Sequence, residues 1–197
     1  MSLDERRQTG LSALALGELE FDVPLAPFTR LRIGGPVDVL VRIDSLESLE
    51  RLKRWCRRER LPLAPLPSGP DLLVKDAGMR GVVAIAAAAE QPDVEEAIEA
   101  LDTEAHGLDL SDCAEGARIF FDPDGHRAED LIRDAGLAGV RLRGARVSED
   151  QPNVVVNEGE ASARDVLALI DYLKRKVEGR SGVKLKELLR VVGRDRA

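Results

Sequence analysis

Short apolar runs alternate with amphipathic segments along the 197 residues of the chain, a pattern typical of α/β proteins. Residues 38–43 alternate toward a strand, and Ser45 stands where a capping residue would begin a helix. Residues 63–66 and 81–86 indicate two more strands, with a turn and short strand at 71–75 between them. Because a strand, a helix and a strand in succession form a crossover, the pattern predicts a βαβ unit whose first two strands are parallel neighbours.

The second half of the chain follows the same alternation beyond an acidic segment at 108–116. A helix is expected at 92–104, and Ser162 with Asp165 has the pattern of a capping box that begins the strongest helix. The other expected elements are a strand at 119–121, a turn at 122–125, a helix around 128–135, and strands at 153–157 and 188–192. The sequence therefore predicts two small lobes, 1–107 and 117–197, joined by a linker at 108–116, whereas residues 1–24 show no clear pattern.

Composition narrows the classes of function. The formal net charge of -7 argues against general binding to nucleic acid or anionic membranes. The basic run at 53–60 is a local exception, either a solvated helix face or a patch for phosphate or a partner. Because no long apolar window occurs and the N-terminus lacks an apolar stretch, we expect a cytoplasmic protein. We expect reduced thiols at Cys56 and Cys113, and His106 and His126 have no metal-ligand spacing.

Three stretches of the chain carry a family resemblance. Residues 25–37 read LAPFTRLRIGGPV, residues 65–83 read PLPSGPDLLVKDAGMRGVV, and residues 127–170 read RAEDLIRDAGLAGVRLRGARVSEDQPNVVVNEGEASARDVLALI. Together they resemble the UDP-N-acetylenolpyruvoylglucosamine reductase (MurB) family of flavoenzymes, which completes UDP-N-acetylmuramic acid for bacterial peptidoglycan. The resemblance implies an α/β (α+β) fold whose two lobes correspond to the first FAD-binding subdomain and the C-terminal substrate-binding domain of that family.

The resemblance also implies that a middle domain is missing. Members of the family carry one between the matched stretches, with a G-I-P-G-x-V-G-G-A stretch and a Y-R-x-S motif that enclose the flavin and supply a catalytic arginine. Neither motif occurs in this chain, and residues 84–115 alone bridge the gap. Half of the flavin cleft is therefore expected to be absent.

The loop that approaches the flavin in the family reads G-G-G-S-N-L-L, with glycines that let backbone N–H groups reach the pyrophosphate. The aligned residues here are Pro67, Ser68, Gly69, Pro70, Asp71, Leu72 and Leu73. Each proline removes one donor, and Asp71 replaces a neutral amide by a carboxylate. Losing two charge-assisted hydrogen bonds of about 1.5 to 3 kcal/mol each weakens binding by on the order of a hundredfold to ten-thousandfold. We therefore expect no cofactor, although the resemblance by itself implies FAD.

The catalytic groups of the family are also replaced. Its mechanism uses a flavin hydride, a serine or cysteine that protonates the carbanion, and an arginine and a glutamate that stabilise the enolate. Alignment places Arg118 at the serine and Leu188 at the glutamate, so no catalytic residue is expected. A slipped alignment would instead bring Ser111 or Cys113 to the first position, and a register shift would bring Glu187 to the second.

The interpretation that follows is a degenerate member without flavin or reductase activity, acting as a binding, regulatory or assembly module linked to peptidoglycan precursor synthesis. The alternative is a residual FAD-dependent UDP-N-acetylmuramate dehydrogenase completed by oligomerisation, and a third is an unrelated ligand in a groove between the lobes. The expected partners are a second copy, another cell-wall synthesis protein or a UDP-sugar. For self-association, the surfaces predicted are the helix at 92–104 and the strand from Gly81.

Overall fold

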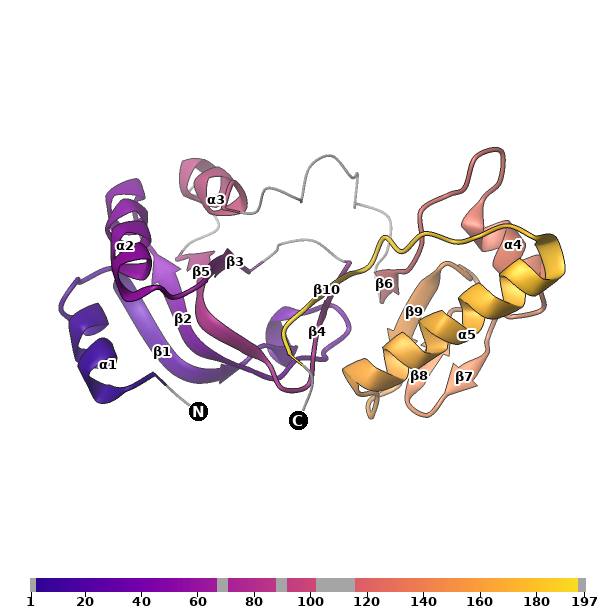
Figure 1. The fold of residues 1–197 in the computed structure, drawn as a ribbon, viewed down its shortest axis with the longest axis horizontal. Coiled ribbons are helices and arrows are strands. Elements are labelled where there is room, and N and C mark those ends of the chain that lie inside the picture. Colours follow the sequence, from indigo (N-terminus) through magenta and orange to yellow (C-terminus); the bar gives the residue numbers. More distant parts are fainter. Residues whose placement is uncertain (1–2, 67–70, 88–91, 102–115, 195–197) are drawn as a thin grey trace. The chain divides into compact units, whose positions relative to one another are not determined.

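The computed structural model describes residues 3–66, 71–87, 92–101 and 116–194 (Figure 1). Its contacts divide the chain into two compact units. The first comprises Met1–Pro24, Pro36–Ser68 and Gly78–Asp109, and the second comprises Leu25–Gly35, Gly69–Ala77 and Leu110–Ala197.

Two segments of the N-terminal half thus belong to the second unit, which differs from the division into 1–107 and 117–197 expected from the sequence. The physical reason is long-range packing: Leu31, Ile33 and Leu73 lie in the same buried cluster as the C-terminal residues. The linker expected at 108–116 falls outside the described residues except for Gly116.

A four-stranded sheet forms the centre of the first unit, in the order β1-β2-β5-β3. The strands are β1 (Gly17–Pro24), β2 (Pro36–Ile43), β5 (Met79–Ala86) and β3 (Leu63–Pro65). Strand β1 is antiparallel to β2, whereas β2 and β3 each run parallel to β5.

The parallel direction expected for β2 and β3 is therefore confirmed, but their expected adjacency is wrong because β5 lies between them. Strand β5 carries a continuous apolar run with four consecutive buried residues, which suits a central position. The short β3 ends at Pro65, and proline is tolerated at the edge of a sheet because it has no N–H to donate.

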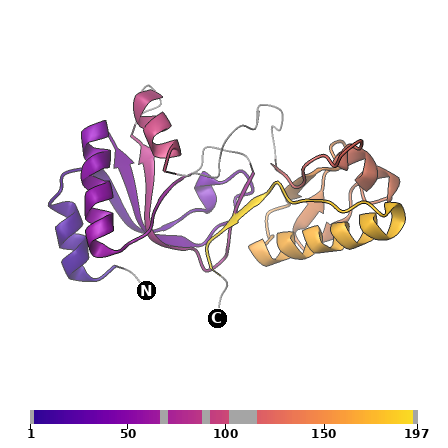
Figure 2. The ribbon, with the colours of Figure 1, turned by 45° about the horizontal axis from the view of Figure 1, so that its top comes forward.

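Three helices share one apolar core with this sheet: α1 (Glu5–Ser12), α2 (Leu46–Glu59) and α3 (Pro92–Glu99). As expected, Ser45 caps α2, its side chain accepting a hydrogen bond from the backbone N–H of Ser48. Figure 2 shows α1 alongside α2, and Arg7 of α1 donates to the carbonyl of Glu59. Helix α1 and strand β1 were not expected, because residues 1–24 contribute few buried side chains and their pattern is correspondingly weak.

The second unit contains an antiparallel sheet in the order β6-β9-β8-β7. Its strands are β6 (Ala117–Arg118), β9 (Val154–Asn157), β8 (Ala145–Val147) and β7 (Arg141–Leu142). Helices α4 (Ala128–Asp134) and α5 (Ala163–Ser181) pack with it, and the capping box expected at Ser162 and Asp165 is present. The strand expected at 119–121 is wrong, because β6 ends at Arg118 and Phe120 makes only an isolated bridge with Glu187. The β7–β8 hairpin was not expected.

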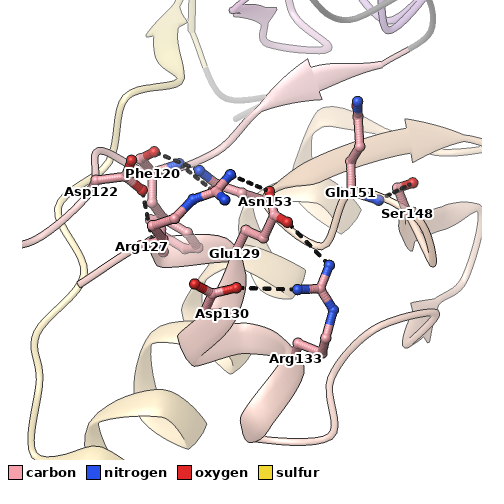
Figure 3. A network of polar contacts seen from close by, with 10 residues as sticks. Phe120, Asp122, Arg127, Glu129, Asp130, Arg133, Ser148, Gln151 and Asn153 are labelled. Atoms are coloured by element: carbon pink, nitrogen blue, oxygen red, sulfur yellow. Dashed lines mark hydrogen bonds and ion pairs between the residues drawn. The ribbon is translucent and has the colours of Figure 1, made fainter.

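A separate parallel pair in this unit joins β4 (Leu72–Val74) to β10 (Arg190–Val192). Directly before β9, Asn153 is buried and fixes Phe120 with two hydrogen bonds, one donated to its carbonyl at 2.8 Å and one accepted from its N–H at 3.0 Å (Figure 3). These contacts hold the start of the C-terminal sheet in register.

No helix within the described ranges is long and apolar enough to cross a bilayer.

Candidate functional site

Asp71 connects three separate stretches of the second unit. It directly precedes β4, and its Oδ1 accepts a hydrogen bond from the backbone N–H of Arg118 at 2.8 Å. Its carbonyl oxygen accepts another from the backbone N–H of Arg190, also at 2.8 Å. One residue therefore holds the beginning of β4, the end of β6 and the beginning of β10 together.

The electrostatic setting of Asp71 is unfavourable for a carboxylate. Its Oδ2 is buried, and it is the single buried side-chain polar atom in the described part of the chain that has no hydrogen-bond partner. Burial raises the pKa of Asp71 above its ordinary value, although the bond from Arg118 and the charges of Arg118 and Arg30 act in the opposite direction. A site with these properties makes the ionised carboxylate less favourable than it is in water.

Positions 118 and 188, which the family resemblance predicts to stand at the family's serine and glutamate, lie close together along the backbone. Arg118 is followed by Ile119, whose carbonyl oxygen accepts hydrogen bonds from the backbone N–H groups of Leu188 and Leu189 at 2.8 and 3.2 Å. Since Asp71 binds Arg118 directly, positions 71, 118 and 188 meet at one place in the unit. The residues at these three positions are an aspartate, an arginine and a leucine, and the last two are joined to the others through the backbone.

Glu187, the other candidate for the glutamate position, is engaged elsewhere. Its backbone pairs with Phe120, and its carboxylate accepts a hydrogen bond from Lys174 of α5 at 2.7 Å. This hydrogen bond, which Lys174 donates to Glu187, is the main reason that the pKa of Lys174 is raised. The observed register thus directs the Glu187 carboxylate to α5.

Only part of the predicted flavin-loop segment is visible in the structure. Asp71 and Leu72 are described, and both Leu72 and Leu73 are buried within β4. The other predicted positions lie outside the described residues: Pro67, Ser68, Gly69 and Pro70 of the loop, and the two proton-donor alternatives Ser111 and Cys113.

The Gly34–Gly35 turn has a packing role. A Cβ atom on Gly34 would lie 3.1 Å from both the backbone nitrogen of Ala26 and the Cβ of Val74, which is closer than most such contacts. The backbone N–H of Gly35 donates to the carbonyl of Lys75 at 3.2 Å. The motif that is most characteristic of the family therefore packs against β4 through its backbone.

Two polar residues that were not predicted attach the N-terminal segments to the body of this unit. Asn157 donates to the carbonyl of Leu31 at 2.8 Å, and Asp76 accepts from the backbone N–H of Ala163, the first residue of α5, at 2.9 Å. The separations of 126 and 87 residues explain why no local pattern indicates these contacts.

Within the described ranges, no group of three or more His, Cys, Asp or Glu side chains could hold a metal ion.

A βαβ unit together with a unit built on an antiparallel sheet places the chain in the α+β fold class. Residues 111–192 match the family model of the UDP-N-acetylenolpyruvoylglucosamine reductase C-terminal domain. The matched part of the chain is a C-terminal domain of the UDP-N-acetylenolpyruvoylglucosamine reductase (MurB) family, and the chain as a whole is similar to members of that family.

Known proteins agree with this placement. The UDP-N-acetylenolpyruvoylglucosamine reductase of Clostridioides difficile is 24% identical over 294 positions, covering 94% of this chain and 97% of that enzyme. That of Geotalea uraniireducens is 47% identical over 77 residues, or 39% of this chain and 26% of that enzyme. The crystal structure of the Thermus caldophilus enzyme has a TM-score of 0.60 at 20% identity, covering 88% of this chain and 98% of that one, and so shares the fold.

The first of these alignments also measures how short this chain is. It extends over 294 positions whereas the chain has 197 residues, so at least 97 positions have no counterpart here. The match nevertheless spans nearly the whole length of the relative. Residues are therefore missing inside the aligned region.

Proposed function

We propose that this chain is a member of the family that has lost flavin binding and reductase activity. It acts as a binding, regulatory or assembly module linked to peptidoglycan precursor synthesis. The observation that carries this proposal is the Asp71–Arg118 hydrogen bond, because it joins the flavin-loop position and the proton-donor position in a contact that serves the fold.

The residues present do not fit a flavin pyrophosphate. Asp71 occupies the position of a neutral amide, and its buried Oδ2 would repel an anion in a setting where charge interactions are weakly screened. Pro67 and Pro70 each lack a backbone N–H, which removes donors from the same loop. Attraction from Arg30 and Arg118 does not overcome the burial of the carboxylate, as the raised pKa of Asp71 indicates.

The catalytic positions do not supply the family's chemistry. A general acid works best when its pKa is near the working pH, which an arginine side chain in general does not offer. Leu188 has no charge with which to stabilise an enolate. The residues absent from the interior of the alignment agree with the loss of the middle domain that supplies the remaining catalytic arginine in the family.

The packing of both units argues that the chain is a functional, folded protein. Each unit has its own buried apolar cluster, and helix α5 has a complete capping box. A sequence without any selected role would not be expected to keep such features together. Binding remains possible without the flavin cleft, which favours a module over an enzyme.

The decisive experiment is flavin reconstitution of the full chain, read by visible absorbance after removal of free FAD. We expect no bound flavin in the natural protein. The matched variant P67G/P70G/D71N restores the donors and the neutral amide, and it tests whether the loop is what prevents binding. Stoichiometric flavin in the natural protein would overturn the proposal and favour the residual dehydrogenase.

A second measurement addresses the ligand. A thermal shift series with UDP-N-acetylglucosamine gives a rising midpoint if the UDP-sugar site survives, because a ligand that binds only the folded state stabilises it. A midpoint that does not move at high ligand concentration removes UDP-sugars from the candidates and leaves a protein partner.

A further inference from the structure

The outer face of helix α2 is basic, although the chain as a whole has a formal net charge of -7. Cationic residues fill the second half of the helix and its C-cap: Arg51, Lys53, Arg54, Arg57, Arg58 and Arg60. Arg51 and Lys53 are half-buried and the others are exposed, whereas the opposite side of the helix is buried in the core of the first unit. We call Arg51, Arg54, Arg57 and Arg58 the arginine face, because the other three lie three or four residues from Arg54 and are its neighbours on the helix surface.

The acidic residues of the helix do not neutralise this face. Glu50 accepts a hydrogen bond from Lys53 at 2.7 Å, and this bond is the main cause of the lowered pKa of Glu50. The Glu59 carboxylate lies 3.5 Å from Arg7 of α1 and 3.4 Å from Arg58, so its charge is shared between two guanidinium groups. Two of the three acidic residues of α2 are therefore already paired.

Three of the arginines are open to a partner. Within the described part of the chain, no hydrogen bond or ion pair engages the side chain of Arg51, Arg54 or Arg57. The charges of Arg57 and Arg54 make only smaller contributions to the lowered pKa of Glu50, after that of Lys53. The guanidinium donors of these arginines are therefore available to an acceptor outside the chain.

The arrangement is unfavourable for the helix by itself. Like charges three or four residues apart on a helix repel each other. The helix dipole favours cations in the last turn, which accounts for Arg57 and Arg58, but it falls off within that turn and does not account for Arg51 and Arg54. Packing onto the sheet uses the opposite side of α2, so the fold does not require these arginines. An anionic partner would relieve their repulsion.

We propose that the arginine face of α2 binds an acidic segment of a partner protein. Guanidinium groups bind carboxylates through paired hydrogen bonds, and all four residues of this face are arginines. Glu47, at the N-terminal end of the helix, fits a neutral or basic residue of the partner and so gives the complex a direction. The partner class rests on the proposed role as a binding module, but its test makes no use of flavin.

Nucleic acids and membranes fit this face less well than a short acidic segment. From Arg51 to Arg58 the helix rises about 10 Å, close to the Debye length of about 8 Å at physiological ionic strength. A short segment therefore responds to these arginines alone, whereas a long polyanion also meets the acidic remainder of the chain. The face offers no aromatic side chain for stacking on bases or for insertion into lipid, because the aromatic residue of α2, Trp55, is buried.

The surfaces predicted from the sequence for self-association are already used within the unit. Strand β5, which contains Gly81, lies between β2 and β3 and has no open edge. Val94 and Ile98 of α3 are buried in the unit's own core. The arginine face of α2 is exposed and needs no rearrangement to bind a partner.

The test measures binding of a fluorescent polyglutamate peptide to the full chain by anisotropy in low salt. The natural chain should bind this peptide more tightly than a single-stranded oligonucleotide of equal charge or a vesicle that contains phosphatidylserine. The variant R54Q/R57Q should raise the dissociation constant by about 2- to 25-fold, because each exposed ion pair changes affinity by a factor of about 1.4 to 5. The control R175Q/R180Q makes the same change at exposed positions of α5 and should alter the dissociation constant by less than about twofold.

Thermal unfolding separates binding from folding. Because glutamine removes like-charge repulsion, R54Q/R57Q should leave the unfolding midpoint unchanged or raise it. If the double variant does not fold, the single variants R54Q and R57Q replace it. A lowered midpoint with an unchanged dissociation constant would show a structural role and overturn the proposal. Absence of polyglutamate binding, tighter binding of the oligonucleotide or the vesicle, or an equal effect of the two double variants would also overturn it. Each of these outcomes leaves the loss of flavin to be decided by reconstitution.

Discussion

The carboxylate of Asp71 accepts the backbone N–H of Arg118 at 2.8 Å, across 47 residues of sequence. The family resemblance predicts that these two positions correspond to the flavin loop and to the proton donor. In this chain they bind each other, and the contact helps to place β4, β6 and β10.

Substituting Asp71→Asn should stabilise the protein at neutral pH. Burial raises the pKa of Asp71 in the folded protein above the value of about 3.9 expected in the unfolded chain. The Asp71 side chain therefore contributes fully to stability below the unfolded pKa, and this contribution is lost as pH rises through the folded pKa. After allowance for partial solvent screening, we expect a gain of about 0.5 to 1 kcal/mol in unfolding free energy near pH 7 and none near pH 4. Denaturant titrations at both pH values measure this gain in unfolding free energy. An equal gain at pH 4 and pH 7 would contradict a raised pKa of Asp71 as its cause. Asp124→Asn, at an exposed position, is the control.

The opposite pH dependence is expected at the start of α5. Hydrogen bonds from Ser162, and then from Arg143, lower the pKa of Asp165. Its contribution is therefore present above the unfolded pKa and is lost as pH falls through the folded pKa. Ser162→Ala should cost about 1 kcal/mol at neutral pH and less in acid, measured by thermal unfolding. A cost that is constant with pH would show that the capping box does not depend on the carboxylate.

Asn153→Ala should be among the most destabilising single substitutions in the second unit. It leaves the carbonyl and the N–H of Phe120 without their side-chain partner in a buried setting. We expect a loss of about 2 to 3 kcal/mol in denaturant unfolding. Ser148→Ala, which removes one exposed hydrogen bond in the same region (Figure 3), should change stability by less than about 0.5 kcal/mol. Similar values for the two variants would contradict the role of Asn153.

Gly34→Ala tests the packing role of the glycine turn. The added methyl group would press on Ala26 and Val74, so we expect destabilisation of about 1 to 2 kcal/mol. Gly179→Ala is the matched control, because a Cβ there meets nothing within 4 Å and lies inside a helix. It should stabilise by about 0.5 to 1 kcal/mol. A neutral result at Gly34 would show that the turn can relax.

Local signals account for what the sequence predicted well. The caps at Ser45 and Ser162 act over three residues, so the starts of α2 and α5 could be placed without the fold. The β4–β10 pair and the insertion of β5 between β2 and β3 depend on partners distant in sequence, and no local pattern encodes them. Alignment to the family identified positions 118 and 188, but their approach to Asp71 required the structure.

The second unit is assembled from three segments that are distant in sequence, and this has a consequence for synthesis of the protein. Strand β4 leaves the ribosome long before its partner, since Leu72 pairs with Arg190 across 118 residues. The segment around Gly34 and the short β4 must remain without their C-terminal packing partners while the intervening chain is made. Translation therefore completes the sheet of the first unit early and leaves two apolar segments of the second unit exposed until the C-terminal residues are made. During this interval chaperones would protect the protein.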